Sequence, residues 1–327
     1  MIVIIGGSGF IGTRLSIRLS QSEQSFQIVD KAQSGFFPDK VLTADVRKSL
    51  SLSFSSKPSA FINLAAEHRD DVRPLSLYDE VNINGASNIC DLARDKGVNK
   101  IIFTSSVAVY GFAPLGTNES GAIDPFNDYG RTKWAAEQVY KQWQSEDPEK
   151  RTLVIIRPTV VFGERNRGNV FNLLKQLVSG KFVMIGNGLN RKSMAYVENV
   201  AAFLEYSLSF KPGVHIYNYI DKPDFTMNRL VGYVNKLLGR STEIKFRLPF
   251  TLGLFIGSCF DFGAKITGNK FPISAIRVKK FCTNSVYESA IELTDFIPPV
   301  PLMEAIEKTV RFEFIEDHKG EQVFYSE

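Results

Sequence analysis

The chain has 327 residues, 44% of them hydrophobic and 23% charged, the balance of a folded protein with a substantial core and room for two domains. Its formal net charge of +4 gives no global field that would point to nucleic acid. The three cysteines, Cys90, Cys259 and Cys282, show neither a disulfide framework nor a metal-ligand spacing, so we expect a reduced, cytoplasmic protein without a metal site.

No targeting segment or membrane-spanning helix is predicted. Met1 leads directly into Ile2–Ile5, an apolar run too short for the core of a signal peptide. The uncharged, apolar stretch 248–260 has 13 residues, whereas a spanning helix needs about 20. We therefore expect a chain that does not cross a bilayer.

Apolar runs alternate with helical patterns through the first two thirds of the chain. The runs predicted to be strands lie at residues 2–5, 26–29, 60–65, 100–104, 153–156 and 214–219. Continuous apolar strands separated by helices indicate a parallel sheet covered on both faces. After about residue 220 the alternation gives way to segments interrupted by Pro and Gly. The predicted fold class is α/β, a Rossmann-like doubly wound parallel sheet with a smaller, mostly C-terminal second domain.

A glycine-rich turn follows the first predicted strand. Gly6, Gly9 and Gly12 lie between this strand and a predicted helix, with Phe10 and Ile11 inside the turn. Such a turn lets a pyrophosphate approach the backbone, and the start of the helix favours its negative charge. The alternative is a glycine-rich turn without a ligand in an unrelated α/β fold.

An acidic residue completes the pattern of a dinucleotide site. Asp30 ends the second predicted strand, about 20 residues after the glycines. Its carboxylate can accept hydrogen bonds from ribose hydroxyls and would repel a 2′-phosphate, so we expect NAD rather than NADP. Asp45 and Val46, after the next candidate strand, are candidates for holding the adenine ring, although a loop acid without a role is nearly as good an interpretation.

Groups suited to proton transfer lie in the middle of the chain. Ser105 and Ser106 follow the strand at 100–104 and so lie at the carboxyl edge of the sheet, where ligands bind in open α/β folds. Tyr129 and Lys133 are four residues apart on a predicted helix and share one face. A nearby ammonium favours the phenolate and makes Tyr129 a candidate base. Taken alone, the two would be an ordinary aromatic–lysine pair.

These motifs together resemble the extended short-chain dehydrogenase/reductases of the sugar-nucleotide epimerase/dehydratase group. The likeness covers essentially the whole chain and is carried by the glycine turn, Asn63–Ala66, the Ser–Ser strand end, Tyr129 with Lys133, Arg157–Pro158 and residues 196–201. We expect an NAD-binding domain of residues 1–167 and 193–219, and a substrate-binding domain of residues 168–192 and 220–327.

The resemblance also implies roles for individual residues. Tyr129 is implied as the catalytic base, Lys133 as its electrostatic partner and ribose ligand, and Ser106 as the hydroxyl near the reacting oxygen, with Ser105 as the neighbouring alternative. Further cofactor contacts are implied for Leu64, Ala65, Ala66, Asn82 and Pro158.

Among the reactions of this group, the resemblance implies an epimerase. Dehydratases of the group carry an Asp–Glu pair directly after the active-site hydroxyl, where this chain has Val107 and Ala108. Reductases of the group tend to use NADP, which Asp30 disfavours. An epimerase oxidises the sugar to a transient 4-keto form and reduces it again on its other face, so it needs no external reductant and keeps its NAD bound.

Less generic stretches narrow the resemblance to bacterial 4-epimerases that act on undecaprenol-linked sugars. They are residues 65–72, 162–170, 192–197, 217–224 and 277–282. The resemblance implies interconversion of GlcNAc and GalNAc on a diphospho-undecaprenol carrier, for surface polysaccharide (O-antigen) biosynthesis. Lys192 stands where this group usually has Arg, which weakens a claim of bidentate diphosphate binding, and Asn199 stands where it usually has Asp.

The expected substrate contacts follow from this resemblance and are less specific. Lys192 and Arg277 are candidate diphosphate ligands and Asn169 is a candidate polar contact, but each could equally be a solvated surface residue. Ser285 lies where related epimerases place the residue that limits acceptance of the N-acetyl group. His68 is either a substrate contact or a loop histidine without a role.

The segment after residue 248 bears on where the protein works. Residues 248–260 are uncharged, and five basic residues and no acid lie from Phe262 to Tyr287. An apolar segment beside a basic one suits a surface that dips into an anionic leaflet, and the alternative is a buried helix beside a diphosphate-binding edge. With the resemblance, we expect a cytoplasmic homodimer that is peripheral on the inner membrane and binds a diphosphate-linked sugar. A soluble UDP-N-acetylglucosamine 4-epimerase and a non-catalytic NAD-binding interaction protein remain open as alternatives.

Overall fold

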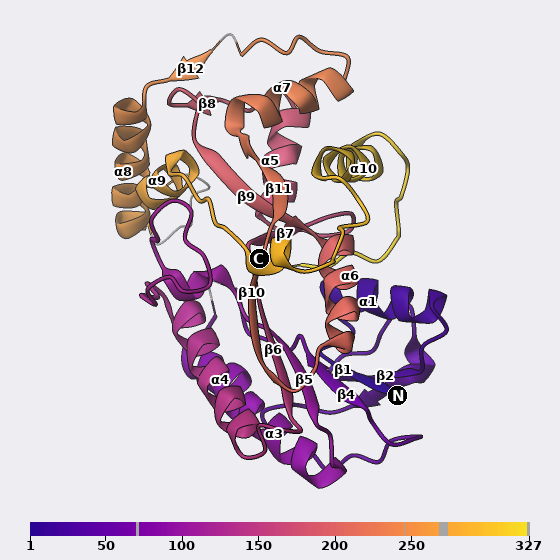
Figure 1. The fold of residues 1–327 in the computed structure, drawn as a ribbon. Helices are drawn as coiled ribbons and strands as arrows, with labels where there is room; N and C mark the ends of the chain where they lie inside the picture. Colours follow the sequence, from indigo (N-terminus) through magenta and orange to yellow (C-terminus); the bar gives the residue numbers. More distant parts are fainter. Residues whose placement is uncertain (70–71, 245, 268–273, 326–327) are drawn as a thin grey trace.

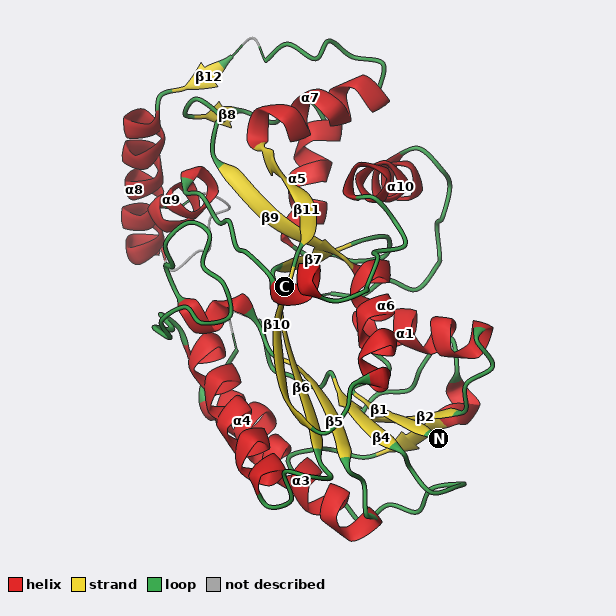
Figure 2. Cartoon of the chain, viewed as in Figure 1, coloured by secondary structure: helices red, strands yellow, loops and turns green. Residues whose placement is uncertain are grey.

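Seven parallel strands form the main sheet of the computed structural model, which describes residues 1–69, 72–244, 246–267 and 274–325 (Figures 1 and 2). The strands are β1 (Ile2–Ile5), β2 (Phe26–Asp30), β3 (Val41–Thr43), β4 (Ala60–Asn63), β5 (Lys100–Thr104), β6 (Thr152–Pro158) and β10 (Gly213–Tyr219). They lie in the order β10-β6-β5-β4-β1-β2-β3. The chain first adds strands outward from β1 and then returns to its other side with β4. This creates a switch point between β1 and β4, beside which ligands bind at the carboxyl ends of the strands.

Helices cover both faces of the main sheet, which confirms the predicted fold class. Val3 and Ile5 of β1 are buried on the face covered by α3 (Gly85–Lys96) and α4 (Asp128–Ser145). Ile2 and Ile4 point the other way, toward the face covered by α1 (Phe10–Gln21) and α6 (Val197–Tyr206). The shorter elements are η1 (Pro38–Lys40), α2 (Ser76–Tyr78), the π-helix η2 (Asp79–Asn84), η3 (Val107–Tyr110) and η4 (Ser207–Ser209). We call the main sheet with these helices the Rossmann lobe.

A second lobe surrounds a three-stranded sheet in the order β11-β9-β7. Its strands are β7 (Val160–Phe162), β9 (Arg191–Tyr196) and β11 (Asp221–Thr226), and a separate pair joins β8 (Met184–Ile185) to β12 (Arg247–Leu248). The remaining helices are α5 (Asn169–Val178), α7 (Met227–Leu237), α8 (Phe250–Thr267), α9 (Ala275–Cys282), η5 (Ala290–Leu293) and α10 (Leu302–Phe314). Side chains of β9, β11, α5, α7 and α10 share one core. Figure 1 shows α8 and α9 at the outer edge of this lobe.

A membrane span requires a helix that is both long and apolar. Of the helices in the described parts of the chain, none is both long and apolar enough to cross a membrane. This includes α8, which contains most of the apolar stretch noted in the sequence.

Candidate active site

One cavity of about 910 Å³ runs along the carboxyl ends of the main strands and reaches into the second lobe. It brings together most of the residues that the sequence predicts for the site. Those that line it are Gly6, Gly9, Phe10, Ile11, Gly12, Asp30, Asp45, Val46, Leu64, Ala65, Ala66, Ser106, Tyr129, Lys133, Pro158, Asn169, Lys192 and Ser285. Two of the predicted site residues, Asn82 and Arg277, lie in described parts of the chain but outside this lining. The residues predicted for cofactor and for substrate therefore face one continuous space.

The glycine turn fits a pyrophosphate. Gly6 has a positive φ of 78°, and an added Cβ there would lie 2.5 Å from the backbone N of Ala65, so only glycine is accommodated. Helix α1 begins at Phe10 with Gly9 as its N-cap, and Gly9 has no side-chain oxygen to offer the first backbone N–H groups. The backbone N–H groups at the start of α1 thus have no side-chain cap, and such a helix start favours a bound anion.

The carboxylate of Asp30 is held in place at the end of β2. It accepts hydrogen bonds from the N–H groups of Ser8 at 3.0 Å and Ala32 at 2.9 Å. Asp45 lines the cavity as well, but hydrogen bonds from the guanidinium of Arg47, 2.6 Å away, occupy its carboxylate and lower the pKa of Asp45. The glycine turn and the fixed charge of Asp30 together fit NAD.

The start of α4 brings Tyr129 next to Ser106. Asn127 caps this helix by accepting a hydrogen bond from the N–H of Gly130 at 2.9 Å. Glycine at position 130 permits the close approach, because an added Cβ would lie 2.4 Å from the carbonyl oxygen of Ala108. Burial raises the pKa of Tyr129 to about 12, and the hydrogen bond with the Ser106 hydroxyl acts in the opposite direction.

Lys133 is buried one helical turn after Tyr129, with 2% of its surface exposed. Its Nζ donates to the carbonyl oxygen of Thr104 at 2.7 Å and lies 5.9 Å from the centre of the Tyr129 ring. Burial lowers the pKa of Lys133 to about 7, while the charge of Glu137 acts to raise it. A phenol, a hydroxyl and an amine therefore meet at one end of the cavity, a set suited to moving a proton.

The structure separates the two neighbouring serines. Ser105 donates from Oγ to Oε1 of Glu137 at 2.6 Å. Glu137 is fully buried and also pairs with Arg157, whose Nη2 lies 2.5 Å from Oε2. Ser106 instead hydrogen-bonds Tyr129. The geometry thus favours Ser106 over Ser105 as the hydroxyl at the reacting oxygen.

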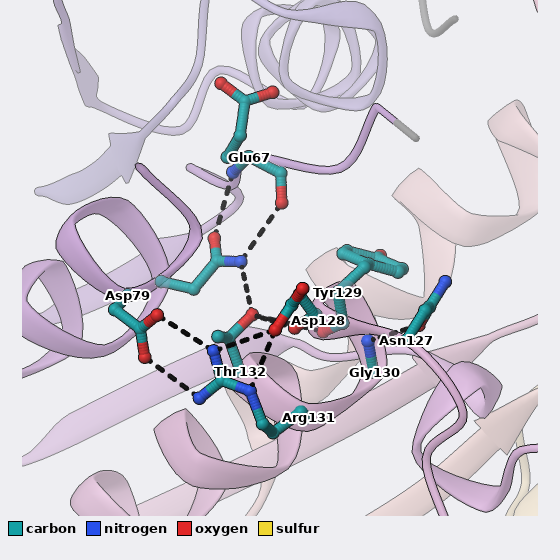
Figure 3. A network of polar contacts seen from close by, with 9 residues as sticks. Glu67, Asp79, Asn127, Asp128, Tyr129, Gly130, Arg131 and Thr132 are labelled. Carbon is teal, nitrogen blue, oxygen red and sulfur yellow. Dashed lines mark hydrogen bonds and ion pairs between the residues drawn. The ribbon is translucent and has the colours of Figure 1, made fainter. Parts of the chain in front are cut away.

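Asn82 supports the cavity wall from outside. Its Oδ1 accepts from the N–H of Glu67 at 2.9 Å, and its Nδ2 donates to the carbonyl oxygen of Glu67 at 3.0 Å and to Oγ1 of Thr132 at 2.9 Å. These bonds tie α4 to the loop after β4. Figure 3 shows that Arg131, on the same helix, pairs with Asp79 of the π-helix. The network fixes the loop that borders the predicted cofactor site.

The second lobe supplies polar groups at the other end of the cavity. Lys192 on β9 donates from Nζ to the carbonyl oxygen of Lys280 at 2.8 Å, and burial lowers the pKa of Lys192 to about 8. Asn169 at the start of α5 and Ser285 after α9 also line the space. Arg277 is exposed on α9, and Lys280 of the same helix contributes to the lining instead. The two lysines make this end suited to an anion.

The segment Val323–Tyr325 also lines the cavity, which the sequence does not indicate. Phe324 donates its N–H to the carbonyl oxygen of Arg165 at 2.7 Å, and its own carbonyl oxygen accepts from the N–H of Arg167 at 2.7 Å. Its ring lies 5.9 Å from that of Phe10 in the glycine turn. No local motif marks this contact, because the two segments are far apart in sequence and meet largely through their backbones.

Comparison with known sequences gives matches along the whole chain. The profile of the NAD dependent epimerase/dehydratase family matches residues 2–219. The N-acetyl-alpha-D-glucosaminyl-diphospho-ditrans,octacis-undecaprenol 4-epimerase of Escherichia coli O157:H7 is 44% identical, over 100% of this chain and 99% of that protein. A UDP-glucose 4-epimerase of Vibrio cholerae is 28% identical over 61% of this chain and 63% of its own. These matches confirm the resemblance that the motifs indicate.

Solved structures share the fold at low sequence identity. A UDP-glucose 4-epimerase of Thermotoga maritima, solved with UDP-glucose, has a TM-score of 0.72 at 19% identity and covers 95% of this chain and 97% of its own. A UDP-N-acetylglucosamine 4-epimerase of Methanobrevibacter ruminantium M1, solved with UDP-N-acetylmuramic acid, has a TM-score of 0.69 at 19% identity, with the same coverage. At this identity the likeness confirms the fold.

Proposed function

This chain belongs to the NAD dependent epimerase/dehydratase family, and we propose that it is a 4-epimerase that interconverts GlcNAc and GalNAc linked through diphosphate to undecaprenol. The observation that carries the proposal is the 44% identity, along both whole chains, to an E. coli enzyme with that substrate in its name. The cavity in which Ser106, Tyr129 and Lys133 meet supports it. We also propose that the product serves the biosynthesis of a surface polysaccharide such as O-antigen.

In the proposed reaction, Tyr129 moves the proton of the sugar's C4 hydroxyl. The hydrogen bond from Ser106 acts to lower the pKa of Tyr129. A protonated Lys133 on the same face of α4 would also favour the phenolate, because an ammonium stabilises a nearby negative charge. The chemistry that NAD supplies when bound is a reversible two-electron oxidation at C4. Tyr129 accepts the proton of one alcohol and returns it to the epimeric alcohol, so its two proton transfers cancel over one turnover.

The wall beside Ser106 supports an epimerase over a dehydratase. Val107 and Ala108 line the cavity at the positions that follow this hydroxyl. Neither side chain can give or take a proton, whereas elimination of water from a sugar needs a second acid–base group. The chain therefore has its proton-transfer group on α4 and an apolar wall beside Ser106.

We propose that Lys192 and Lys280 bind the substrate diphosphate, because both line the cavity at the end remote from the glycine turn. Asn169 and Ser285 are proposed as contacts to the sugar. Arg277 stays a prediction as a diphosphate ligand, since it lies outside the described lining.

Three further features of the protein are proposals. The lipid anchor of the proposed substrate supports a peripheral position on the cytoplasmic face of the inner membrane. We propose a homodimer as the working form. The proposed domains are residues 1–167 with 193–219 for NAD and residues 168–192 with 220–327 for the substrate.

The experiment that tests the function uses two substrates and no added reductant. Purified protein is incubated with GlcNAc-diphospho-undecaprenol and, separately, with UDP-GlcNAc, and the 4-epimer is measured in each. We expect conversion of the lipid-linked sugar. Conversion of UDP-GlcNAc alone would identify a soluble nucleotide-sugar epimerase instead, and conversion of neither would support a non-catalytic NAD-binding protein.

A further inference from the structure

Helix α8 exposes a row of apolar side chains. Leu252, Phe255 and Phe262 are 45%, 66% and 67% exposed, and Cys259 is exposed as well. The spacing of three, four and three residues places these four side chains on one face of the helix. We call them the apolar stripe. An exposed row of this kind on a folded protein marks an interaction surface.

The opposite face of α8 holds the helix against the protein. An added Cβ at Gly253 would lie 2.8 Å from Cγ2 of Ile185, and one at Gly257 would lie 2.7 Å from the backbone N of Ala275, so these glycines face inward. Asp261 also turns inward, where its carboxylate accepts the N–H of Ala275 at 3.0 Å. Figure 1 shows α8 at the margin of the molecule, with α9 beside it. The stripe therefore points outward, and the one acid in the described part of α8 does not share its direction.

Helix α9 places positive charge next to this stripe. Lys279 and Lys280 are exposed, and Ile276 on the same helix is 50% exposed. From Phe262 to Tyr287 the sequence contains no acid that would neutralise these charges locally. Apolar side chains beside lysines match the two layers of an anionic membrane surface, hydrocarbon and headgroup.

The same helix leads into the cavity. Lys280 of α9 lines it, as do Thr283–Tyr287 directly after the helix, while Val278 of α9 packs against Gly253 of α8. One short element thus joins the apolar stripe to the end of the cavity that carries Lys192. A lipid whose headgroup lies in the cavity would have its chain directed toward this side of the molecule.

We propose that the apolar stripe and the exposed Lys279 of α9 form the face by which the protein docks on an anionic bilayer, so that the substrate end of the cavity, where Lys280 lies, meets the membrane surface. The choice of partner rests on the proposed function, because a lipid-linked sugar must be reached at the bilayer. A second copy of the chain fits this face less well, since a symmetric contact would bring the lysines of α9 near those of the other copy.

Vesicle co-sedimentation tests the docking face directly. Full-length protein is mixed with phosphatidylcholine vesicles with and without phosphatidylglycerol, and bound protein is measured after centrifugation. Phe255→Ser combined with Phe262→Ser should weaken binding to the anionic vesicles at least about tenfold, because two aromatic rings lose their burial. The matched control is Leu293→Ser with Ile297→Ser, which removes two side chains that are 88% and 83% exposed but lie in and after η5, away from α8. This control should bind like the wild type.

The charge of α9 is tested in the same assay. Lys279→Gln should weaken binding to vesicles that contain phosphatidylglycerol and leave binding to pure phosphatidylcholine unchanged, since it removes only the attraction to the anionic headgroups. Equal binding of wild type and the Phe255/Phe262 double variant would overturn the proposal. So would a change in molar mass by light scattering in that variant without any vesicle binding, because the stripe would then be a contact between subunits.

A second readout separates this inference from the proposed function. Epimerisation is measured on GlcNAc-diphospho-undecaprenol in vesicles and on a GlcNAc-diphosphate with a short, water-soluble prenyl chain. The Phe255/Phe262 double variant should lose activity on the first and keep it on the second, because the stripe lies outside the cavity lining. If the wild type sediments with vesicles, the double variant does not, and neither sugar is converted, the proposed function is wrong and the docking face stands. If it converts both without binding vesicles, the docking face is wrong and the function stands.

Discussion

Lys133 and Tyr129 share one face of α4, with Nζ of Lys133 5.9 Å from the centre of the Tyr129 ring and 2.7 Å from the carbonyl oxygen of Thr104. This arrangement predicts that loss of the phenolic oxygen separates turnover from cofactor binding. Tyr129→Phe should lower kcat by roughly 10²- to 10⁴-fold, the usual contribution of general acid–base catalysis. NAD extracted from the denatured variant should stay at the wild-type level, because the glycine turn and Asp30 are untouched. Turnover near that of the wild type would remove Tyr129 from the mechanism.

The burial of Lys133 predicts a pH-dependent stability. Its pKa is about 7 in the folded chain against an ordinary value of 10.5, so between these values the unfolded chain holds a proton that the folded chain has released. The stability of the wild type relative to Lys133→Met should therefore rise with pH across this window, by up to about 1.4 kcal/mol per pH unit. Urea unfolding of both proteins from pH 7 to pH 10 measures the slope. A difference that stays constant with pH would mean that Lys133 titrates as an exposed lysine does.

The two neighbouring serines predict different phenotypes. Ser106→Ala removes the hydrogen bond that lowers the pKa of Tyr129, so that pKa should rise and the acid limb of the kcat/KM profile should move to higher pH. Ser105→Ala is the matched control, because it removes the bond to Glu137 without touching Tyr129. It should leave the pH profile in place and lower the free energy of unfolding by about 1.5–3 kcal/mol, because the lost bond is to a buried, charged carboxylate. The reverse pattern would assign the reacting hydroxyl to Ser105.

Asp30 predicts the cofactor preference. Ser8 and Ala32 donate their N–H groups to different oxygens of Asp30, so Asp30→Asn keeps an acceptor for only one of them, and it removes the negative charge. We expect the affinity for NADP relative to NAD to rise at least about tenfold, since repulsion of the 2′-phosphate is lost. Titrations of cofactor-free protein with each dinucleotide measure the ratio. Asp45→Asn is the control, because Arg47 already occupies that carboxylate; equal ratios in the two variants would show that Asp30 does not face the ribose.

The main sheet could largely be predicted from sequence because its central strands are mostly apolar runs. The runs at Ile2–Ile5 and Lys100–Thr104 coincide with β1 and β5. The sheet of the second lobe gives no such signal. Strand β7 has three residues, and β9 begins with Arg191 and Lys192, so neither reads as a strand alone. These strands form because they pair with segments distant in sequence.

In the candidate active site too, local features could be predicted from sequence and long-range contacts could not. The pairing of Tyr129 with Lys133 could be predicted because a spacing of four residues on a helix is a local property. The choice between Ser105 and Ser106 could not, because it depends on Glu137, which lies 32 residues beyond Ser105. Asn82 shows the same limit. Its position in sequence does not tell whether its amide faces the cavity or, as in the structure, binds the backbone of Glu67 from outside the cavity lining.

Glu137 and Arg157 form a fully buried ion pair inside the Rossmann lobe. Arg157 also donates to the hydroxyl of Tyr110 at 2.7 Å, and that hydroxyl donates to Oδ1 of Asn218 at 2.8 Å. Loss of either charged partner would leave the other charge buried and unpaired. This would lower the free energy of unfolding by about 3–5 kcal/mol, a large share of the stability of a typical domain. A single substitution at either position is therefore destabilising. Over evolutionary time we expect Glu137 and Arg157 to be kept together or to be replaced together by a pair of apolar residues.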